Sequence, residues 1–184
     1  MDVGGTSALD GLSFLSTGDR VLVLGAARAL FEAAAGLRIR ARGELKVTDR
    51  DPLEAIQSGS VAGAPLDPPL PAVWTLREYV VWSARLAGHP RGTARDLADE
   101  AIERLKLASL SSSKLGGVAI AARRGAVVAA ALATGAPALF VEDPTAALPA
   151  DTARSFARIV VRALSDRRTA VFAPRLYPRK ICKT

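Results

Sequence analysis

Residues 138–149, ALFVEDPTAALP, constrain the fold of this chain more than any other stretch. A short apolar run, residues 138–141, ends abruptly in two carboxylates, Glu142 and Asp143, and then in a Pro-Thr turn. A buried parallel strand delivers acidic side chains to its carboxyl edge in this way. Because open α/β sheets bind ligands at that edge, the stretch predicts an α/β fold with a site beside the two acids.

Composition allows one ordinary domain and few kinds of chemistry. The chain has 184 residues, of which 49% are hydrophobic, so it can bury a sizeable core. Its single cysteine, Cys182, rules out an intramolecular disulfide, and its single histidine, His89, argues against a zinc site. No metal site is predicted. His89 stands in Gly-His-Pro-Arg-Gly and is expected to be an exposed turn residue.

Charge and hydropathy suggest where the protein works. A formal net charge of +7 suits contact with anionic lipid headgroups, nucleic acid or an acidic protein. The first residues, MDVGGTSALDG, lack the basic region and apolar core of a secretion signal, so a cytoplasmic protein is expected. Residues 125–141 carry no charge, but Gly135 and Pro137 interrupt them, and a membrane span needs about 20 continuous apolar residues. They predict a buried helix, a turn and a buried strand.

The first third of the chain is predicted to form strands and one helix. Residues 9–14 predict a loosely alternating strand, and the β-rich run 21–24 predicts a second, central strand. Strong helix formers follow over residues 26–35, and Gly36 is expected to end that helix. Residues 43–47 predict a short strand of an antiparallel sheet.

Helices dominate the middle of the chain. A short one is predicted over residues 53–57. Thr75-Leu-Arg-Glu78 is a capping box that begins a helix carrying Tyr79 and Trp82. A further helix from about Thr93 places apolar residues at helical spacing.

Three stretches together resemble the ATP-binding cassette (ABC) ATPases. ALFVEDPTAALP is similar to their Walker B strand and D-loop, TLREYVVWSARLAG to the start of their helical subdomain, and TAVFA to the strand before their switch histidine. The resemblance covers residues 9–174. It implies an α/β, P-loop NTPase-like (RecA-like) core with a small antiparallel β part and an inserted helical subdomain, whereas the residues alone also allow a generic doubly wound fold.

The same resemblance implies a division of the chain. It is expected to form a single degenerate nucleotide-binding domain over residues 1–184. Its core is expected at residues 1–69 and 118–174, its helical subdomain at residues 70–117, and a basic tail at residues 175–184.

The phosphate loop of the family is missing from the predicted position. The pattern Gly-x4-Gly-Lys-Ser/Thr wraps phosphates in backbone N–H groups, and its lysine and hydroxyl reach the outer phosphates and magnesium. After Gly25 the chain reads AARALFEAAAGL, without the second glycine, the lysine or the hydroxyl residue. Arg28 is the nearby cation, and its fork cannot replace a lysine held in a backbone nest. Gly25 and Arg28 are therefore interpreted as remnants of a deleted site.

The other nucleotide motifs depart from the family as well. Leu66 or a neighbour takes the place of the Q-loop glutamine, which in the family ligates magnesium and senses nucleotide. The signature motif aligns with residues 115–117 or with residues 118–122, and neither alignment keeps its serine and glutamine. Pro149 replaces the D-loop aspartate, and Pro174 and the arginine after it stand where the family has its switch histidine.

The two acids of residues 142 and 143 stand in the reverse of the family order. Exchanging Asp and Glu alters each side chain's reach by about one methylene, enough to spoil a catalytic geometry held to within roughly 1 Å. Glu142 and Asp143 are therefore interpreted as degenerate Walker B remnants that cap Thr145 and its turn. No catalytic residue is predicted, and neither ATP nor magnesium is an expected cofactor.

The resemblance also implies a docking surface. In the family, a groove beside the Q-loop receives a cytoplasmic coupling helix of the membrane subunit. Here the residues of that groove would be Leu66, Asp67, Pro68, Leu70, Trp74, Tyr79 and Trp82. Trp74 and Trp82 are equally compatible with a role in the core of the helical subdomain.

These observations predict a non-catalytic cassette subunit that docks on the cytoplasmic side of a membrane transport-type protein, peripheral to the inner face of the membrane. The expected partners are an integral membrane protein, a competent cassette subunit and anionic lipid headgroups. Nucleic acid and small-molecule ligands are not expected, and a homodimer should be weak or absent.

Two alternatives stay open. The first is an active transporter ATPase with an unusual phosphate site built from Arg28 and the acids 142 and 143. The second is a soluble adaptor or nucleic-acid-binding protein that uses its basic surface, against which the lack of stacking aromatics among the basic clusters counts.

Overall fold

A computed structural model describes residues 13, 15–25, 27–38 and 43–174. Strands and helices alternate along this part of the chain. Their order is β1 (Arg20–Leu24), α1 (Ala27–Ala34), α2 (Pro52–Gln57), β2 (Val61–Ala64), α3 (Leu76–Leu86), α4 (Arg91–Arg104), the 3-10 turns η1 (Ala108–Leu110) and η2 (Leu115–Gly117), α5 (Ile120–Ala133), β3 (Ala138–Glu142), α6 (Ala150–Ala163) and β4 (Arg168–Ala173).

The strands form one parallel sheet in the order β1-β4-β3-β2. Residues 138–142 are the strand that the apolar run predicted, and every residue of β3 is buried. Its register aligns Val141 with Val171 of β4 and with Ala64 of β2. Because all four strands run the same way, their carboxyl ends meet at one edge of the sheet.

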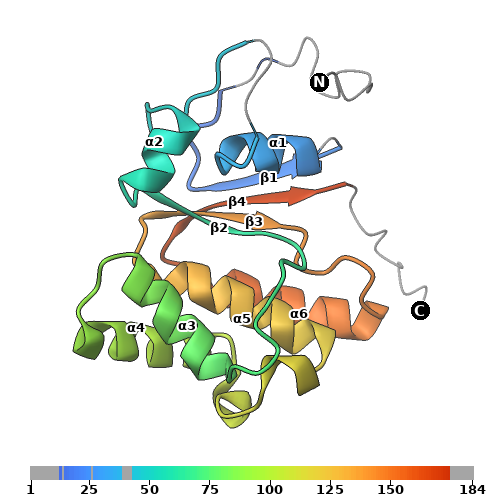
Figure 1. The fold of residues 1–184 in the computed structure, drawn as a ribbon. Coiled ribbons are helices and arrows are strands. Elements are labelled where there is room, and N and C mark those ends of the chain that lie inside the picture. Colours follow the sequence, from blue (N-terminus) through green and yellow to red (C-terminus); the bar gives the residue numbers. More distant parts are fainter. Residues whose placement is uncertain (1–12, 14, 26, 39–42, 175–184) are drawn as a thin grey trace, which may run out of the picture.

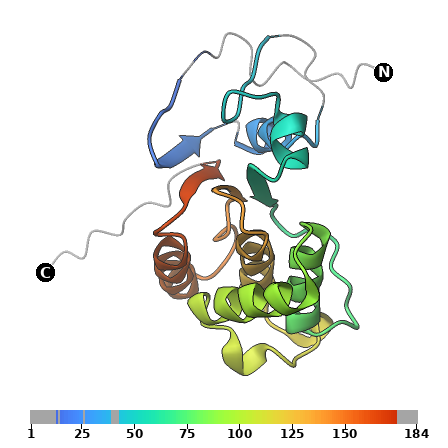
Figure 2. The ribbon, with the colours of Figure 1, turned by 90° about the vertical axis from the view of Figure 1, so that its left-hand side faces the viewer.

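Helices cover both faces of the sheet (Figures 1 and 2). On one face, Phe31 of α1 packs edge to face on Phe172, which also contacts Phe140. On the other face, Leu139 and Val141 join a larger apolar cluster with α5 and α6. The alternation of β3 side chains between two separate clusters explains why the whole run from 138 to 141 is apolar. The α/β prediction is confirmed.

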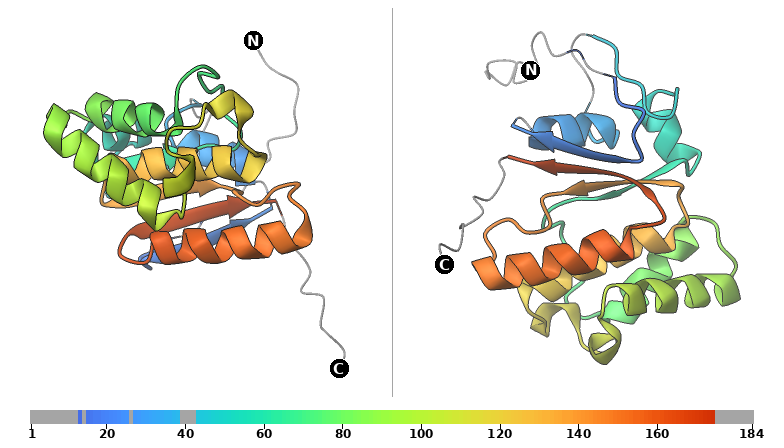
Figure 3. Two further views of the ribbon diagram at one scale, coloured as in Figure 1. Left: turned by 90° about the horizontal axis from the view of Figure 1, so that it is seen from below. Right: turned by 180° about the vertical axis from the view of Figure 1, so that it is seen from behind.

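Helices α3 and α4 form an outer layer that packs on α5 rather than on the sheet (Figure 3). Their most buried side chains, such as Leu76, Val80 and Ala98, are fully enclosed and belong to the same cluster as α5. Small alanines on α4 and α5 let these helices approach closely. The alanine-rich sequence that follows residue 119 is therefore the central helix between the sheet and the outer layer.

Two strand predictions are wrong in part. The run at residues 21–24 forms β1, but β1 pairs only with β4 and so lies at the edge of the described sheet, with Leu22 and Leu24 about half exposed. An apolar run cannot reveal how many neighbours a strand will have. Residues 43–47 form no strand and contribute one antiparallel bridge, from Val47 to Arg50. Nearly all of the predicted strand 9–14 lies outside the described residues.

His89 is not the exposed turn residue that the sequence suggested. It is partly buried, and its ring Nε2 donates a hydrogen bond of 2.8 Å to the carbonyl oxygen of Thr134. Thr134 ends α5, and the next residue, Gly135, has a φ of +75°. A donor at that position satisfies one of the carbonyl groups that a helix leaves unpaired at its C-terminus. His89 thus ties the loop before α4 to the end of α5.

The capping box at the start of α3 gives a direct test of this local structure. The Thr75 side chain accepts from the backbone N–H of Glu78, and the Glu78 carboxylate accepts from the backbone N–H of Thr75. Thr75→Ala should lower the free energy of unfolding by about 1 kcal/mol in urea denaturation. Thr75→Ser, which keeps the hydroxyl, should stay near wild type. Equal stability of all three proteins would contradict the assignment.

Candidate functional site

The carboxyl edge of the sheet brings together the residues that the motif analysis singled out. Gly25 follows β1, and its N–H donates to the carbonyl of Ala173 at the end of β4. Leu66 follows β2, and Glu142 ends β3. The backbone N–H of Asp143 donates to the carbonyl of Phe172 at 2.8 Å. The parallel topology therefore gathers these four segments at one edge of the sheet.

Both carboxylate oxygens of Glu142 face polar groups of neighbouring segments. Its Oε2 accepts a hydrogen bond of 2.9 Å from the backbone N–H of Leu66, which lies 76 residues earlier. Its Oε1 lies 3.9 Å from Nε of Arg28, and only 9% of its side chain is exposed. Arg28 itself donates to Glu32 at 3.1 Å. One carboxylate therefore connects the end of β3, the start of α1 and the chain after β2.

Asp143 occupies a strained and buried position. Its φ is +20°, a conformation that residues other than glycine rarely adopt, and only 3% of the residue is exposed. Oδ1 accepts from the hydroxyl of Thr145 at 3.2 Å, in line with the capping role expected for it. Oδ2 is buried and has no hydrogen-bond partner among the residues that the structure describes. Buried carboxylate oxygens without a partner are uncommon in proteins, so this one sets Asp143 apart from the other acids of the described chain.

The turn between β1 and α1 is very short. Strand β1 ends at Leu24 and α1 begins at Ala27, with only Gly25 and Ala26 between them. The N–H of Ala27 donates to the carbonyl of Gly25 at 2.7 Å, and Gly25 has a φ of +101° that suits glycine alone. This turn carries the chain directly from strand to helix.

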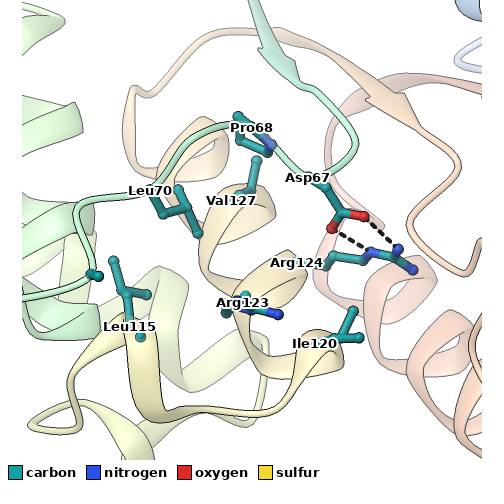
Figure 4. A pocket seen from close by; sticks show the side chains of 10 residues that line it. Asp67, Pro68, Leu70, Leu115, Ile120, Arg123, Arg124 and Val127 are labelled. Atoms are coloured by element: carbon teal, nitrogen blue, oxygen red, sulfur yellow. Dashed lines mark hydrogen bonds and ion pairs between the residues drawn. The ribbon is translucent and has the colours of Figure 1, made fainter.

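Arg124 is the site residue that the sequence analysis missed. It lies in the second turn of α5, and only 7% of its side chain is exposed. Its Nε and Nη2 donate to the two carboxylate oxygens of Asp67 at 2.9 and 2.8 Å (Figure 4). Its Nη1 donates to the carbonyl of Ala146 and, at 3.5 Å, to that of Pro144. An arginine in an alanine-rich helix carries no signal of burial, so sequence reasoning had no means of finding this contact.

The contact with Arg124 changes the acidity of Asp67. Hydrogen bonds from the Arg124 guanidinium hold the pKa of the Asp67 carboxyl below its usual value, although partial burial opposes them. The backbone of Asp67 is left-handed, with a φ of +47°. Its side chain is 57% exposed, so solvent screens the attraction on one side.

A cavity of about 350 Å³ opens beside this ion pair. It lies between the segment after β2 and the start of α5 (Figure 4). Its lining includes three of the predicted docking residues, Asp67, Pro68 and Leu70, together with Arg123 and Arg124. Leu66 lies apart from this cavity, beside Glu142.

The three aromatic docking candidates divide into two kinds. Trp74 and Trp82 stack edge to face with ring centres 6.0 Å apart, and Trp82 stays 52% exposed. Tyr79 packs against the large apolar cluster, and burial raises the pKa of its phenol. Trp82 is therefore available at the surface, whereas Tyr79 is partly buried against the core.

Only one of the two signature alignments falls at the start of a helix. Helix α5 begins at Ile120, with Ala119 at its N-cap and no side-chain cap. Residues 118–122 thus span the helix N-terminus, whereas residues 115–117 form the separate turn η2. In η2 a Cβ on Gly116 would come within 3.1 Å of the carbonyl oxygen of Ala72, which explains the glycine by packing.

Within the described residues, no cluster of three or more histidine, cysteine, aspartate or glutamate side chains is arranged to hold a metal ion. No helix in that part of the chain combines the length and the apolar character needed to cross a membrane.

The fold defined by these elements is that of an ABC ATP-binding cassette. Solved structures share it. A metal-chelate-type ABC transporter in an inward-facing conformation matches with a TM-score of 0.74 and 19% identity, over 92% of this chain and 68% of that one. CbiO1 of Clostridium perfringens, part of the ABC transporter complex CbiONQ, matches with a TM-score of 0.70 and 15% identity, over 85% and 67%.

A curated relative resembles the chain in sequence. The cytochrome c biogenesis ATP-binding export protein CcmA of Cereibacter sphaeroides is 28% identical over 175 residues, which cover 92% of this chain and 76% of the relative. A comparison with known protein-family profiles found no match. The resemblance to ABC cassettes that the motifs indicated is thus confirmed in sequence and in fold.

The Asp67–Arg124 pair predicts a particular pH dependence. Because the folded pKa of Asp67 is lowered, the pair contributes stability above the ordinary aspartate pKa of about 3.9 and loses it as the pH falls through the folded value. Because solvent screens the exposed side of the pair, Asp67→Asn should lower the free energy of unfolding by only about 1 kcal/mol near pH 7, with a smaller difference from wild type near pH 3. Urea denaturation at both pH values measures this. A difference that does not shrink in acid would contradict it.

Proposed function

We propose that this chain is a non-catalytic (pseudo-ATPase) cassette subunit that docks on the cytoplasmic side of a membrane transport-type protein. The observation that carries the proposal is the junction of Gly25 and Ala26 between β1 and α1. Phosphate binding at a strand-to-helix turn needs several backbone N–H groups that wrap the ligand and a lysine that reaches it. Only two residues separate β1 from α1, and neither of them is a lysine.

The engagement of Glu142 supports the same proposal. A carboxylate that holds magnesium needs oxygens free to meet the ion or its water ligands. Here one oxygen accepts from the Leu66 backbone and the other faces Arg28. These contacts support the proposal that neither nucleotide nor magnesium is bound at this edge, and we assign the chain no catalytic step.

An exposed apolar surface supports docking. Trp82 and Leu86 lie four residues apart on α3, so they share one face of the helix, and Leu86 is 73% exposed. Val73, also 73% exposed, precedes Trp74, whose ring contacts Trp82. Exposed aromatic and aliphatic side chains gathered in this way are characteristic of protein interfaces, and tryptophan is enriched among their energetic centres.

The chemistry of the partner follows from the kinds of protein that the chain resembles. CcmA is described as an ATP-binding export protein, and the solved relatives are parts of ABC transporters. We therefore propose an integral membrane protein of that type as the partner, with a competent cassette subunit as a second one. The excess of basic residues, +7 over the whole chain, suits a position at the inner membrane face near anionic headgroups.

One observation favours the alternative of an active ATPase. Asp143 Oδ2 is buried and unpaired, and such an oxygen is suited to polarise a water molecule. The alternative then needs a phosphate site that uses Arg28, whose side chain is 74% exposed.

Titration with Mg-ATP separates the two functions. We expect no binding heat and no shift in the melting temperature for wild type or for Asp143→Asn. The melting measurement is sensitive, because a ligand at a hundred times its dissociation constant stabilises a protein by about 2.7 kcal/mol. Saturable binding to wild type, with turnover that falls in Asp143→Asn, would replace the proposed function by the enzymatic one.

A charged residue on the exposed face of α3 should prevent docking. Trp82→Glu is expected to reduce the membrane-bound fraction of the protein at least about tenfold in cells that contain its native membranes. The reason is that an aromatic side chain at the centre of an interface contributes much of the binding energy. Val161→Glu is the matched control, because Val161 is 60% exposed on α6, outside the predicted docking set. Equal losses in both variants, or in neither, would contradict docking through α3.

A further inference from the structure

Arg124 hydrogen-bonds two segments that are far apart in the sequence. One is the segment that follows β2, residues 65–70, here called the docking linker. The other is the turn that follows β3, residues 143–148, here called the edge turn. The guanidinium pairs with Asp67 at 2.8 and 2.9 Å in the docking linker and donates to the carbonyl of Ala146 in the edge turn. Its N–H groups are thus hydrogen-bonded to both segments at the same time.

Both segments hold residues in conformations that are unfavourable on their own. Asp67 in the docking linker has a φ of +47°, and Ala147 in the edge turn has a φ of +54°. Neither is glycine. Backbone of this kind persists where the surrounding structure fixes it, and it returns to ordinary conformations when those contacts are lost. Arg124 supplies such contacts to both segments.

Burial makes the two contacts depend on each other. The Arg124 side chain is 7% exposed, and Asp67 is its ion-pair partner within the described chain. A buried cation that loses its paired carboxylate is strongly disfavoured, so the guanidinium must move toward water. When it moves, it leaves the carbonyl of Ala146 as well. A change that begins in the docking linker is therefore transmitted to the edge turn.

We propose that Arg124 is a positioning residue that couples the docking linker to the edge turn, so that a partner bound at the linker alters the turn without any nucleotide. Asp67, Pro68 and Leu70 line the cavity with Arg124, so the same contact fixes the shape of the surface that receives the partner. The identity of this surface as a docking site rests on the proposed function. The coupling itself is a property of the isolated chain and is testable on it.

Hydrogen exchange of the purified full-length protein tests the coupling. Asp67→Asn removes the charge that holds Arg124 and keeps the size of the side chain. We expect amide exchange to become faster at Leu66, Asp67 and Leu70, the residues of the docking linker that carry an amide proton, and also at residues 145–148. The expected increase is about tenfold, which corresponds to a change of about 1.4 kcal/mol in the free energy of local opening.

Asp99→Asn is the matched control. Asp99 also accepts two hydrogen bonds from one arginine, Arg77 of α3, each 2.6 Å long. That pair is exposed and lies between α3 and α4, so its loss should leave the edge turn unchanged. Faster exchange confined to residues 65–70 in Asp67→Asn, or equal effects of both variants on the edge turn, would overturn the proposal.

A second variant keeps the test decisive if Asp67→Asn is poorly folded. Arg124→Lys retains the positive charge but lacks the planar fork that reaches both segments. It should keep most of the protection in the docking linker and lose it in the edge turn. Wild-type exchange at residues 145–148 in Arg124→Lys would also overturn the proposal.

The same experiment with millimolar Mg-ATP separates this inference from the proposed function. Protection by ATP at the β1–α1 junction would refute the pseudo-ATPase function, whatever Asp67→Asn does. Without an ATP effect, exchange changes confined to the docking linker would refute the coupling alone.

Discussion

A single buried guanidinium joins the segments that meet at the carboxyl edge of this sheet. Arg124 reaches the edge from α5 and is bonded to the chain after β2 and to the turn after β3. Charged groups are costly to bury, and they are tolerated only when almost every donor has an acceptor. The carboxylate of Asp67 and the carbonyls of the edge turn provide those acceptors, so the local backbone is organised around one side chain.

The order of the two acids at the end of β3 has a structural consequence. Glutamate at position 142 is long enough to reach across to the backbone of Leu66, and it does so at 2.9 Å. Aspartate at position 143 is shorter and stays within its own turn, where it accepts from Thr145. Each acid therefore satisfies backbone or side-chain donors of the protein itself. The reversal of the family order favours an edge held together by internal hydrogen bonds.

Retention of the cassette fold despite these changes is understandable from where the core lies. The apolar clusters on the two faces of the sheet involve β3, α1, α5 and α6, and the large one extends to α3 and α4. None of these clusters depends on a phosphate loop. The packing of such a chain therefore does not depend on which residues stand at the sheet edge, and Trp82, exposed on α3, lies outside that edge.

The sequence by itself determined the elements and their order. The apolar run before Glu142, the glycine after residue 24, the capping box at Thr75 and the helical spacing of apolar residues are local patterns, and each corresponds to a strand end or helix in the structure. The short junction between β1 and α1 was equally visible, because helix-forming residues begin directly after Gly25. Contacts between residues far apart in the chain were not visible in the sequence. The edge position of β1, the contact of His89 with Thr134 and the burial of Arg124 against Asp67 all join residues distant in sequence. Only the tertiary structure decided them, because packing and the burial of charge depend on which elements become neighbours.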